Sequence, residues 1–273
     1  MDSSAPNSVR GTGGARIELR GVGVTYAGGS VAVRDVDLTI AAGEFAVFLG
    51  PSGSGKSTLL RTINRLIEPT SGSVFIDDID VRTLDPVVLR RGIGYVIQAV
   101  GLFPHLTIGA NVGVVPALLG WDRARTARRV DDLLALVRLD PAIYRDRYPR
   151  QLSGGEQQRA GVARALAAEP RVLLMDEPFG AVDAIVRASL QDEIRRIHRE
   201  LGTTIVFVTH DVDEALRLAD RVVVIAAGAI AQADAPQRVL EAPANDIVRS
   251  LVGIDAESRH FALERPLLER ETP

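Results

Sequence analysis

A glycine-rich stretch at residues 50–58 constrains the fold of this chain more than any other feature. It reads Gly-Pro-Ser-Gly-Ser-Gly-Lys-Ser-Thr and lies between an apolar run, Phe45–Leu49, and a helical pattern. The glycines permit backbone conformations in which consecutive N–H groups point at a phosphate, and the helix that follows adds the positive end of its dipole. The stretch therefore predicts a phosphate-binding loop between a buried strand and a helix.

Lys56 supports this interpretation because it is the only lysine among the 32 basic residues, and all the others are arginine. We attribute the arginine bias to genome composition, so the one lysine calls for a specific reason. Arginine carries a planar five-donor fork, whereas lysine carries a compact charge on a flexible stem. We expect Lys56 to bind the β- and γ-phosphates and the Ser57 hydroxyl to bind Mg²⁺. The residues expected to hold the nucleotide are Gly50, Pro51, Ser52, Gly53, Ser54, Gly55, Lys56, Ser57 and Thr58.

Two adjacent carboxylates follow a second apolar run. Asp176 and Glu177 come directly after Val172–Met175. In open α/β sheets, ligands bind outside the carboxyl ends of the strands. Asp176 is therefore expected to hold Mg²⁺, directly or through water, and Glu177 to polarise a water for attack on the γ-phosphate. Many strands end in acidic residues for solubility, so this pair alone is a weak signal. Together with the phosphate loop it indicates a catalytic site.

A second glycine-rich stretch, Leu152-Ser-Gly-Gly-Glu-Gln157, precedes a helical pattern that extends to Ala168. Ser153 and Glu156 have the spacing of a capping box, which is one interpretation of the stretch. A cap needs no pair of glycines, however, and glycine in a first turn costs helix stability. Backbone N–H groups without side chains over them form an anion site open to a large ligand. We therefore expect a second phosphate-binding loop, formed by Ser153, Gly154, Gly155 and Glu156.

The order of the apolar runs predicts an α/β fold. Ile17–Tyr26 and Val31–Ile40 alternate in the manner of half-buried antiparallel strands. Three further runs are apolar or β-branched throughout, and each leads into a polar or glycine-rich turn and a helical pattern. This alternation is typical of a parallel sheet with crossover helices. The three runs are Phe45–Leu49, Val172–Met175 and Thr204–Val208, and Arg221–Ile225 with Ala229–Ala233 predicts a hairpin.

Composition excludes several classes of protein. The chain has no cysteine, which excludes a disulfide framework, a cysteine-based zinc site and a thiol nucleophile. The net charge of −3 gives no general attraction to nucleic acid. The longest apolar stretch, Val222–Ala231, has about ten residues, whereas a membrane-spanning helix needs roughly 20. The N-terminus lacks an apolar core suited to secretion. We therefore expect a cytoplasmic protein that reaches a membrane only through partners.

Together these motifs resemble the ATP-binding cassette (ABC) family of ATPases over residues 16–255. The resemblance also rests on Gln98 after the strand Ile93–Ile97, on Gly180-Ala-Val-Asp183, and on Thr209-His210-Asp211 after a buried strand. It implies a P-loop NTPase fold with a mixed, mainly parallel sheet core, an N-terminal antiparallel β subdomain and an inserted α-helical subdomain at about 99–158. Residues 1–15 are expected to form a flexible tail, and residues 256–273 a C-terminal tail.

The same resemblance implies roles for single residues. Tyr26 is expected to stack on the adenine ring, and Asp183 to lie at the nucleotide. As catalytic residues it indicates Glu177 as the general base, His210 at the γ-phosphate, and Gln98 at Mg²⁺ or the attacking water. In the family, the Ser-Gly-Gly segment of one subunit closes on ATP held by the phosphate loop of another. One chain with one cassette therefore implies a head-to-tail homodimer that binds ATP and Mg²⁺.

A closer resemblance, to the ATPases of osmoprotectant importers, rests on Gly94–Thr107, Leu119-Gly-Trp121 and Tyr144–Pro149. Such importers take up glycine betaine, choline, carnitine or proline. The resemblance implies an ATPase coupled to transport, an integral membrane permease, a substrate-binding protein, and a peripheral position on the inner face of the plasma membrane. Many relatives carry a regulatory CBS pair after the cassette. Twenty residues follow Gly253, so no such pair is expected here.

Three alternatives stay open. The cassette does not touch the solute, so it is equally suited to a transporter of another small solute, such as an amino acid, or to an exporter. A soluble ABC protein acting on DNA or ribosomes is disfavoured by the lack of cysteines, the short interval between Gln98 and Ser153, and the single cassette; no nucleic-acid partner is expected.

Arginines spread between Gly101 and Gln151 are interpreted as a solvated helical face rather than an anion or membrane site.

Overall fold

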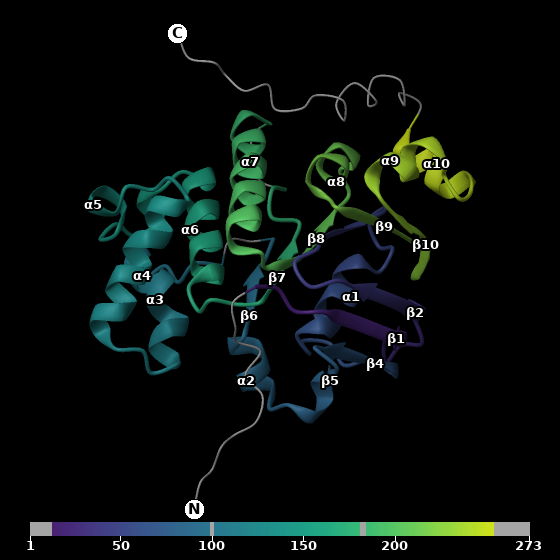
Figure 1. The fold of residues 1–273 in the computed structure, drawn as a ribbon, viewed down its shortest axis with the longest axis horizontal. Helices are drawn as coiled ribbons and strands as arrows, with labels where there is room; N and C mark the ends of the chain where they lie inside the picture. The colour runs from purple at the N-terminus through teal and green to yellow at the C-terminus, as the bar shows by residue number, and fades with distance from the viewer. Residues whose placement is uncertain (1–12, 99–100, 181–183, 254–273) are drawn as a thin grey trace, which may run out of the picture.

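The computed structural model describes residues 13–98, 101–180 and 184–253, and its strands form two sheets (Figure 1). The larger sheet has the strand order β10-β9-β3-β8-β7-β6. Its neighbours from β6 to β9 run parallel, and β10 pairs antiparallel with β9. The strands are β3 (Phe45–Leu49), β6 (Ile93–Val96), β7 (Val172–Asp176), β8 (Thr204–Thr209), β9 (Arg221–Ala226) and β10 (Ala229–Asp234). This is the mainly parallel sheet, ending in a hairpin, that the sequence predicts.

The smaller sheet is antiparallel and has the strand order β2-β1-β4-β5. It confirms the pairing predicted for the first two runs and adds two short strands that the sequence pattern did not indicate. Ile17 lies opposite both Ile40 and Ile76, so the three strands share one buried face. The strands are β1 (Ile17–Thr25), β2 (Val31–Ile40), β4 (Ser71–Ile76) and β5 (Ile79–Asp80).

Helices cover the larger sheet and extend beyond one of its edges (Figure 1). Helices α3 to α6 pack together next to the edge strand β6. Most helices begin after a Ser, Thr, Asp or Asn whose side chain accepts an N–H of the first turn. The helices are α1 (Lys56–Ile63), α2 (Pro86–Arg91), α3 (Ile108–Leu118), α4 (Arg123–Leu136), α5 (Pro141–Tyr144), α6 (Gly154–Leu166), α7 (Ala184–Leu201), α8 (Val212–Leu218), α9 (Pro236–Glu241) and α10 (Asp246–Val252), with 3-10 turns at Val81–Thr83 and Pro149–Gln151.

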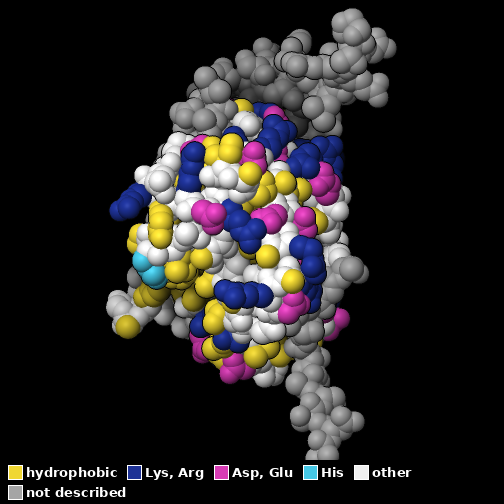
Figure 2. Space-filling model, turned by 90° about the vertical axis from the view of Figure 1, so that its left-hand side faces the viewer, with side chains coloured by type: hydrophobic (Ala, Val, Ile, Leu, Met, Phe, Trp, Pro, Cys, Tyr) yellow, Lys and Arg dark blue, Asp and Glu magenta, His cyan; other side chains and the backbone are white. Residues whose placement is uncertain are grey.

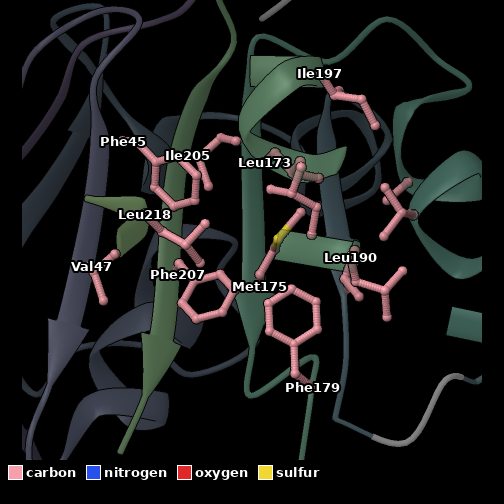
Figure 3. Close-up of a cluster of buried hydrophobic side chains, with 14 of the residues drawn as sticks. Phe45, Val47, Leu173, Met175, Phe179, Leu190, Ile197, Ile205, Phe207 and Leu218 are labelled. Carbon is pink, nitrogen blue, oxygen red and sulfur yellow. The ribbon is translucent and has the colours of Figure 1, made fainter. Parts of the chain in front are cut away.

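Strands β3, β7 and β8 of the larger sheet are buried on both faces, which explains their mainly apolar sequences. Alternate residues of each strand enter two different cores. Phe45, Val47 and Leu49 face the helical side, together with Phe207 and Met175 of neighbouring strands (Figure 3). The residues between them pack against the antiparallel sheet and α1. Each large side chain buried in this way contributes about 1.5–3 kcal/mol to stability.

The fold begins before residue 16, which corrects the expected limit of the N-terminal tail. Ala15 is fully buried, and its N–H donates to the Arg171 carbonyl at 3.3 Å. The Thr204 hydroxyl donates to the Ala15 carbonyl at 2.7 Å, and the Arg171 guanidinium donates to the Gly14 carbonyl at the same distance. Gly14 and Ala15 are therefore anchored to the ends of two core strands. The C-terminal tail expected at 256–273 lies outside the described residues.

Arginines of the helical group are spread over its outer face. In Figure 2, which views the molecule from this side, basic side chains alternate with acidic and hydrophobic ones and do not gather in one patch. Several also have structural partners. The Arg125 guanidinium lies 3.4 Å from the centre of the Trp121 ring, and Arg129 donates to the Leu166 carbonyl at 3.1 Å. These contacts support a solvated face over an anion or membrane site.

Candidate nucleotide-binding site

Four predicted site segments meet at one edge of the larger sheet because the strands before them run parallel and in register. Leu49 of β3 pairs with Thr209 of β8, and Asp176 of β7 pairs with Val208 of β8. β6 pairs with β7 in the same direction. The residues that follow these strands therefore emerge side by side. They are the phosphate loop at 50–55, Glu177, His210 and Gln98.

The phosphate loop depends on glycine at two positions, for its backbone conformation at both and for lack of space at one. Gly53 and Gly55 have φ angles of 77° and 101°, in the left-handed region. A Cβ at Gly55 would also lie 2.2 Å from the Ala32 carbonyl oxygen of β2. The loop is thus packed against the antiparallel sheet, and its curvature is set before any ligand binds.

Lys56 begins helix α1 and points back into this loop. Its ammonium donates to the carbonyls of Gly50 and Pro51, both at 2.7 Å, and the residue is 4% exposed. Burial lowers the pKa of Lys56 below its usual value, while the carboxylates of Glu177 and Asp176 act in the opposite direction. A cation enclosed by loop carbonyls at a helix N-terminus is well placed to receive an anion.

Asp176 and Ser57 supply neighbouring oxygen atoms behind the loop. The Ser57 hydroxyl donates to Asp176 Oδ1 at 2.6 Å, and Asp176 is 3% exposed. Oxygen ligands of this kind suit Mg²⁺, which is usually held by one or two protein groups together with phosphates and water. In the part of the chain that the structure describes, no group of three or more His, Cys, Asp or Glu side chains could hold a metal alone.

Two partners of Asp176 were missed by sequence reasoning. Arg61 forms an ion pair with Asp176 Oδ2 at 2.9 Å, and the Tyr95 hydroxyl lies 3.5 Å from the same oxygen. Arg61 follows Ser57 by four residues, so both lie on the same face of α1, and this spacing could have signalled the contact. Tyr95 lies on β6, and only the pairing of β6 with β7 brings it to Asp176.

Glu177 lies where the four strand ends converge. Its Oε2 is 3.5 Å from the Gln98 side-chain nitrogen and 3.3 Å from His210 Nδ1. The residue has a φ of 45°, a conformation that costs a non-glycine residue energy and is found at functional sites. Its N–H donates to the Val208 carbonyl at 3.0 Å, which fixes this turn to β8. One carboxylate therefore faces the two other predicted catalytic side chains.

A buried carboxyl stands behind His210. Glu214, 6% exposed, accepts a hydrogen bond from the Thr209 hydroxyl at 2.6 Å and one from the Gln191 side chain at 3.4 Å. Burial raises the pKa of this carboxyl above its usual value. Because Thr209 directly precedes His210, Glu214 ties the end of β8 to helix α7. The sequence interpretation did not include it.

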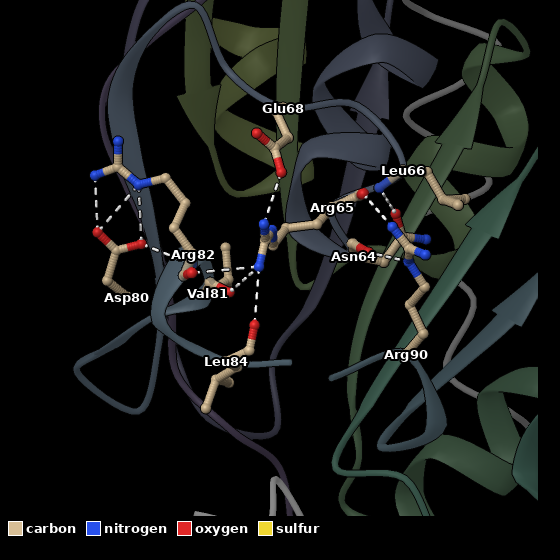
Figure 4. Close-up of polar contacts among 9 residues, drawn as sticks. All are labelled: Asn64, Arg65, Leu66, Glu68, Asp80, Val81, Arg82, Leu84 and Arg90. Carbon is tan, nitrogen blue, oxygen red and sulfur yellow. Dashed lines mark hydrogen bonds and ion pairs between the residues drawn. The ribbon is translucent and has the colours of Figure 1, made fainter. Parts of the chain in front are cut away.

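Helix α1 is also anchored at its far end, so that the loop is held from both sides (Figure 4). Arg65 donates to the Leu84 carbonyl at 2.9 Å and pairs with Glu68 at 2.6 Å. Arg90 donates to the Asn64 carbonyl at 3.1 Å. These contacts attach the end of α1 to α2 and to the segment before it. A rigid α1 keeps Lys56 and Ser57 in fixed positions relative to the sheet.

Tyr26, directly after β1, is an exposed aromatic residue beside the phosphate loop. Its hydroxyl lies 3.0 Å from the Thr58 hydroxyl, and the residue is 46% exposed. The contact attaches the ring to the second residue after Lys56. An exposed aromatic face beside a phosphate loop is suited to stacking on a base.

The second predicted phosphate loop lies elsewhere, at the start of α6. Ser153 caps the helix, and Ser153 and Glu156 form the capping box in both directions. A Cβ at Gly154 would meet no atom within 4 Å, so this end of the helix is open. Helix α6 packs on α3, α4, α7 and β6, whereas α1 packs on β2, β4, β7 and β8. One chain therefore does not bring the two loops together. Asp183 lies outside the described residues.

Comparison with known proteins agrees with this geometry. Residues 33–180, which include the phosphate loop, the α6 cap and Glu177, match the model of the ABC transporter family. The chain belongs to that family. It is 53% identical over 254 residues to the glycine betaine/carnitine/choline transport ATP-binding protein OpuCA of Bacillus subtilis, covering 93% of this chain. It is also 53% identical over 226 residues to the glycine betaine uptake system ATP-binding protein YehX of Escherichia coli, covering 83% of this chain.

A solved ABC structure supports the same assignment. The dimeric structure of a post-hydrolysis state of the ATP-binding cassette MJ0796, bound to ADP and Pi, is 35% identical in sequence. It superposes with a TM-score of 0.72 and covers 81% of this chain and 98% of its own. The chain spans 66% of the length of the OpuCA relative and 73% of the YehX relative. Over the described residues, every helix is too short or too polar to cross a bilayer.

Proposed function

We propose that this chain is the ATP-binding and ATP-hydrolysing subunit of an ABC importer that takes up an osmoprotectant such as glycine betaine, choline, carnitine or proline. The proposal rests on the site at the strand ends together with the relatives, which are named for glycine betaine, carnitine and choline transport. The observation that carries hydrolysis is the position of Glu177, whose carboxylate faces Gln98 and His210 next to the phosphate loop.

ATP binding is assigned to the phosphate loop and Tyr26. The loop N–H groups and the Lys56 ammonium receive the β- and γ-phosphates, for which Lys56 turns away from the Gly50 and Pro51 carbonyls. The Tyr26 ring stacks on adenine. Ser57 and Asp176 would hold Mg²⁺, with Gln98 as a further ligand. Bound Mg²⁺ supplies positive charge to phosphate oxygens during transfer. The donor set fits, because the hydroxyl and carboxylate already share one hydrogen bond.

Hydrolysis is assigned to Glu177 as the general base. A carboxylate that orients a water through one oxygen needs neighbours that fix its own position, and Gln98 and His210 both lie at Glu177 Oε2. His210 and Lys56 stabilise negative charge on the γ-phosphate, and such electrostatic stabilisation accounts for most of phosphoryl-transfer catalysis. The left-handed turn at Glu177 keeps its carboxylate at the mouth of the site.

The α6 cap completes the site only in a second copy of the chain. Ser153–Glu156 begins α6, which packs in the helical group, whereas the phosphate loop leads into α1, which packs on strands of both sheets. We therefore assign the cap of one subunit to the ATP held by the other. Two ATP are then enclosed head to tail. Asp183 contributes at the same interface. The dimeric relative bound to ADP and Pi supports this arrangement. Closure and reopening drive an integral membrane permease at the inner face of the plasma membrane, and a substrate-binding protein delivers the solute.

Glu177→Gln tests the assignment of the base. We expect it to lower the rate of ATP hydrolysis by at least about 100-fold, because the amide cannot accept the proton, while ATP binding persists and an ATP-bound dimer accumulates. Phosphate release and size-exclusion chromatography with light scattering measure the two effects. Glu169→Gln, a surface glutamate paired with Arg125, is the matched control. Hydrolysis at the wild-type rate in the Glu177 variant would show that another group is the base.

The solute requires a separate experiment. The chain should co-purify with a membrane permease, and cells lacking it should lose uptake of labelled glycine betaine, choline, carnitine or proline under osmotic stress. Loss of amino-acid or sulfate uptake instead would keep the ATPase assignment and overturn the solute. Co-purification with ribosomes would overturn the transport assignment. A strain without other osmoprotectant importers prevents masking.

A further inference from the structure

The segment Tyr144–Pro149, which resembles osmoprotectant ATPases in sequence, contacts the α6 cap directly. Tyr144 ends helix α5, and its hydroxyl donates to Glu156 Oε1 at 2.5 Å. The other oxygen of the same carboxylate, Oε2, accepts the Ser153 N–H at 2.7 Å and the Ser153 hydroxyl at 2.9 Å. Glu156 therefore has one oxygen on α5 and the other on the cap.

This third partner changes what the capping box can do. The terminal torsion of a glutamate has a broad energy profile, so a carboxylate held by the cap alone can rotate. Tyr144 fixes the second oxygen and with it the plane of the carboxylate. Hydrogen bonds from Tyr144 and then from the Ser153 N–H lower the pKa of Glu156. The Glu156 carboxylate is thereby hydrogen-bonded on both sides, by Tyr144 of α5 and by Ser153 of the cap.

The Tyr144 segment is itself fixed to helix α3. The Ile108 N–H donates to the Arg147 carbonyl and the Gly109 N–H to the Arg145 carbonyl, both at 2.8 Å. A Cβ at Gly109 would lie 2.8 Å from the Arg145 side chain, so this approach requires glycine. Arg145 also pairs with Asp131 of α4 at 2.7 Å. The segment from Tyr144 to Arg147 thus connects the cap of α6 to the start of α3.

We propose that Tyr144 is a positioning residue that holds Glu156, and through it Ser153, in the conformation that receives the nucleotide of a second subunit. This role of Tyr144 rests on the proposed function, in which the cap of one subunit closes on ATP held by the other. Because Tyr144 lies on α5 and acts through Glu156, its loss acts on closure of the dimer and not on binding of ATP to the phosphate loop. Residues of the α6 cap would then move with the start of α3 as one unit.

Tyr144→Phe removes only the hydroxyl and keeps the ring, which packs against the helical core. Tyr148→Phe is the matched control, since Tyr148 lies on the same segment and its ring is approached by Arg150. Hydrogen exchange of the full chain without nucleotide measures positioning directly. We expect the Ser153 amide to exchange roughly five times faster in Tyr144→Phe, because hydrogen bonds to charged groups are the stronger ones, and at the wild-type rate in Tyr148→Phe.

Dimer closure is measured in the Glu177→Gln background with saturating ATP. Tyr144→Phe should weaken the ATP-bound dimer by roughly fivefold or more, while the affinity of the monomer for ATP and the melting temperature of the chain change little. Glu156→Gln combined with Tyr144→Phe should weaken it no further than Glu156→Gln alone, because both act through one carboxylate.

Hydrogen exchange and dimerisation together distinguish a failure of the Tyr144 role from a failure of the proposed dimer. An unchanged Ser153 exchange rate, or a dimer within twofold of its parent, overturns the role of Tyr144. A parallel loss of monomer affinity or of melting temperature identifies a general structural defect and overturns it as well. If Glu177→Gln alone fails to dimerise with ATP, the proposed dimer function fails, and faster Ser153 exchange still decides whether Tyr144 positions the cap.

Discussion

The phosphate loop at residues 50–58 is shaped by backbone packing, whereas the cap at Ser153–Glu156 is shaped by side chains. The first is enclosed between β2, β3 and α1, and its charged residue Lys56 is buried, as is the neighbouring Asp176 of β7. The second is an open helix end whose form depends on hydrogen bonds among Ser153, Glu156 and Tyr144. Backbone packing gives a fixed receptor for a small, highly charged ligand. At the cap, side-chain hydrogen bonds hold an open helix end in the form that the proposed second subunit would meet.

The largest effect that this comparison predicts is at Lys56. Lys56→Arg keeps the charge, but its fork does not fit a position that is 4% exposed and enclosed by two carbonyls at 2.7 Å. We expect ATP hydrolysis to fall by on the order of 100-fold and ATP affinity to weaken, since the two side chains are not equivalent at a close-fitting site. Calorimetric titration and phosphate release measure both. Arg249→Lys, on the surface of α10, is the control for the reverse exchange. Retained activity would show that charge alone is needed.

More of the phosphate loop and its neighbours than of the α6 cap could be predicted from the sequence. The glycines, Lys56, Ser57 and the strand-end acids belong to contiguous motifs, and the apolar runs place those motifs at one edge of a parallel sheet. Tyr95 could not be assigned, because its contact with Asp176 depends on which strand lies next to β7. Chain order does not give that neighbour. Arg61 could have been found from its spacing to Ser57.

The second region shows a different limit of sequence reasoning. The capping box was readable because Ser153 and Glu156 are three residues apart in one helix turn. Tyr144 was noticed only as part of a resemblance. Its contact with Glu156 depends on how the short helix α5 packs against α6, which no local pattern encodes. The N-terminal limit was misplaced for a similar reason, since Gly14 and Ala15 are held by Arg171 and Thr204, far away in sequence.

A smaller effect is expected at the cap. Ser153→Ala removes the hydroxyl that accepts the Glu156 N–H, which costs about 1 kcal/mol of stability. If the cap acts only on the nucleotide of the partner, hydrolysis should fall by roughly tenfold while the monomer binds ATP as before. Thr107→Ala removes an equivalent cap from α3 and is the control for lost stability alone. Equal losses of hydrolysis in the two variants, or weaker ATP binding by the Ser153 variant, would remove the distinction between the two regions.

The smallest predicted effect is on the pH dependence of stability. The pKa values of Glu214, at the sheet edge that carries the phosphate loop, and of Glu156, in the cap, shift in opposite directions. Burial raises the pKa of Glu214, so its contribution to stability is fully present below its unfolded pKa of about 4.3 and is lost as pH rises through the folded value. Hydrogen bonds from Tyr144 and Ser153 lower the pKa of Glu156, so its contribution is present above about pH 4.3 and is lost as pH falls through the folded value.

Urea unfolding at a series of pH values between 3.5 and 8, chosen to bracket roughly the unfolded pKa of a glutamate, measures both contributions. As pH rises, the wild type should lose free energy of unfolding relative to Glu214→Gln. As pH rises through the acidic end of the series, the wild type should gain free energy of unfolding relative to Glu156→Gln. Each variant is the control for the other, since both replace one carboxyl by an amide. Equal slopes would mean that the sheet edge and the α6 cap hold their carboxyl groups in the same way, and the contrast between a buried, packed site and an open, hydrogen-bonded one would fail at these residues.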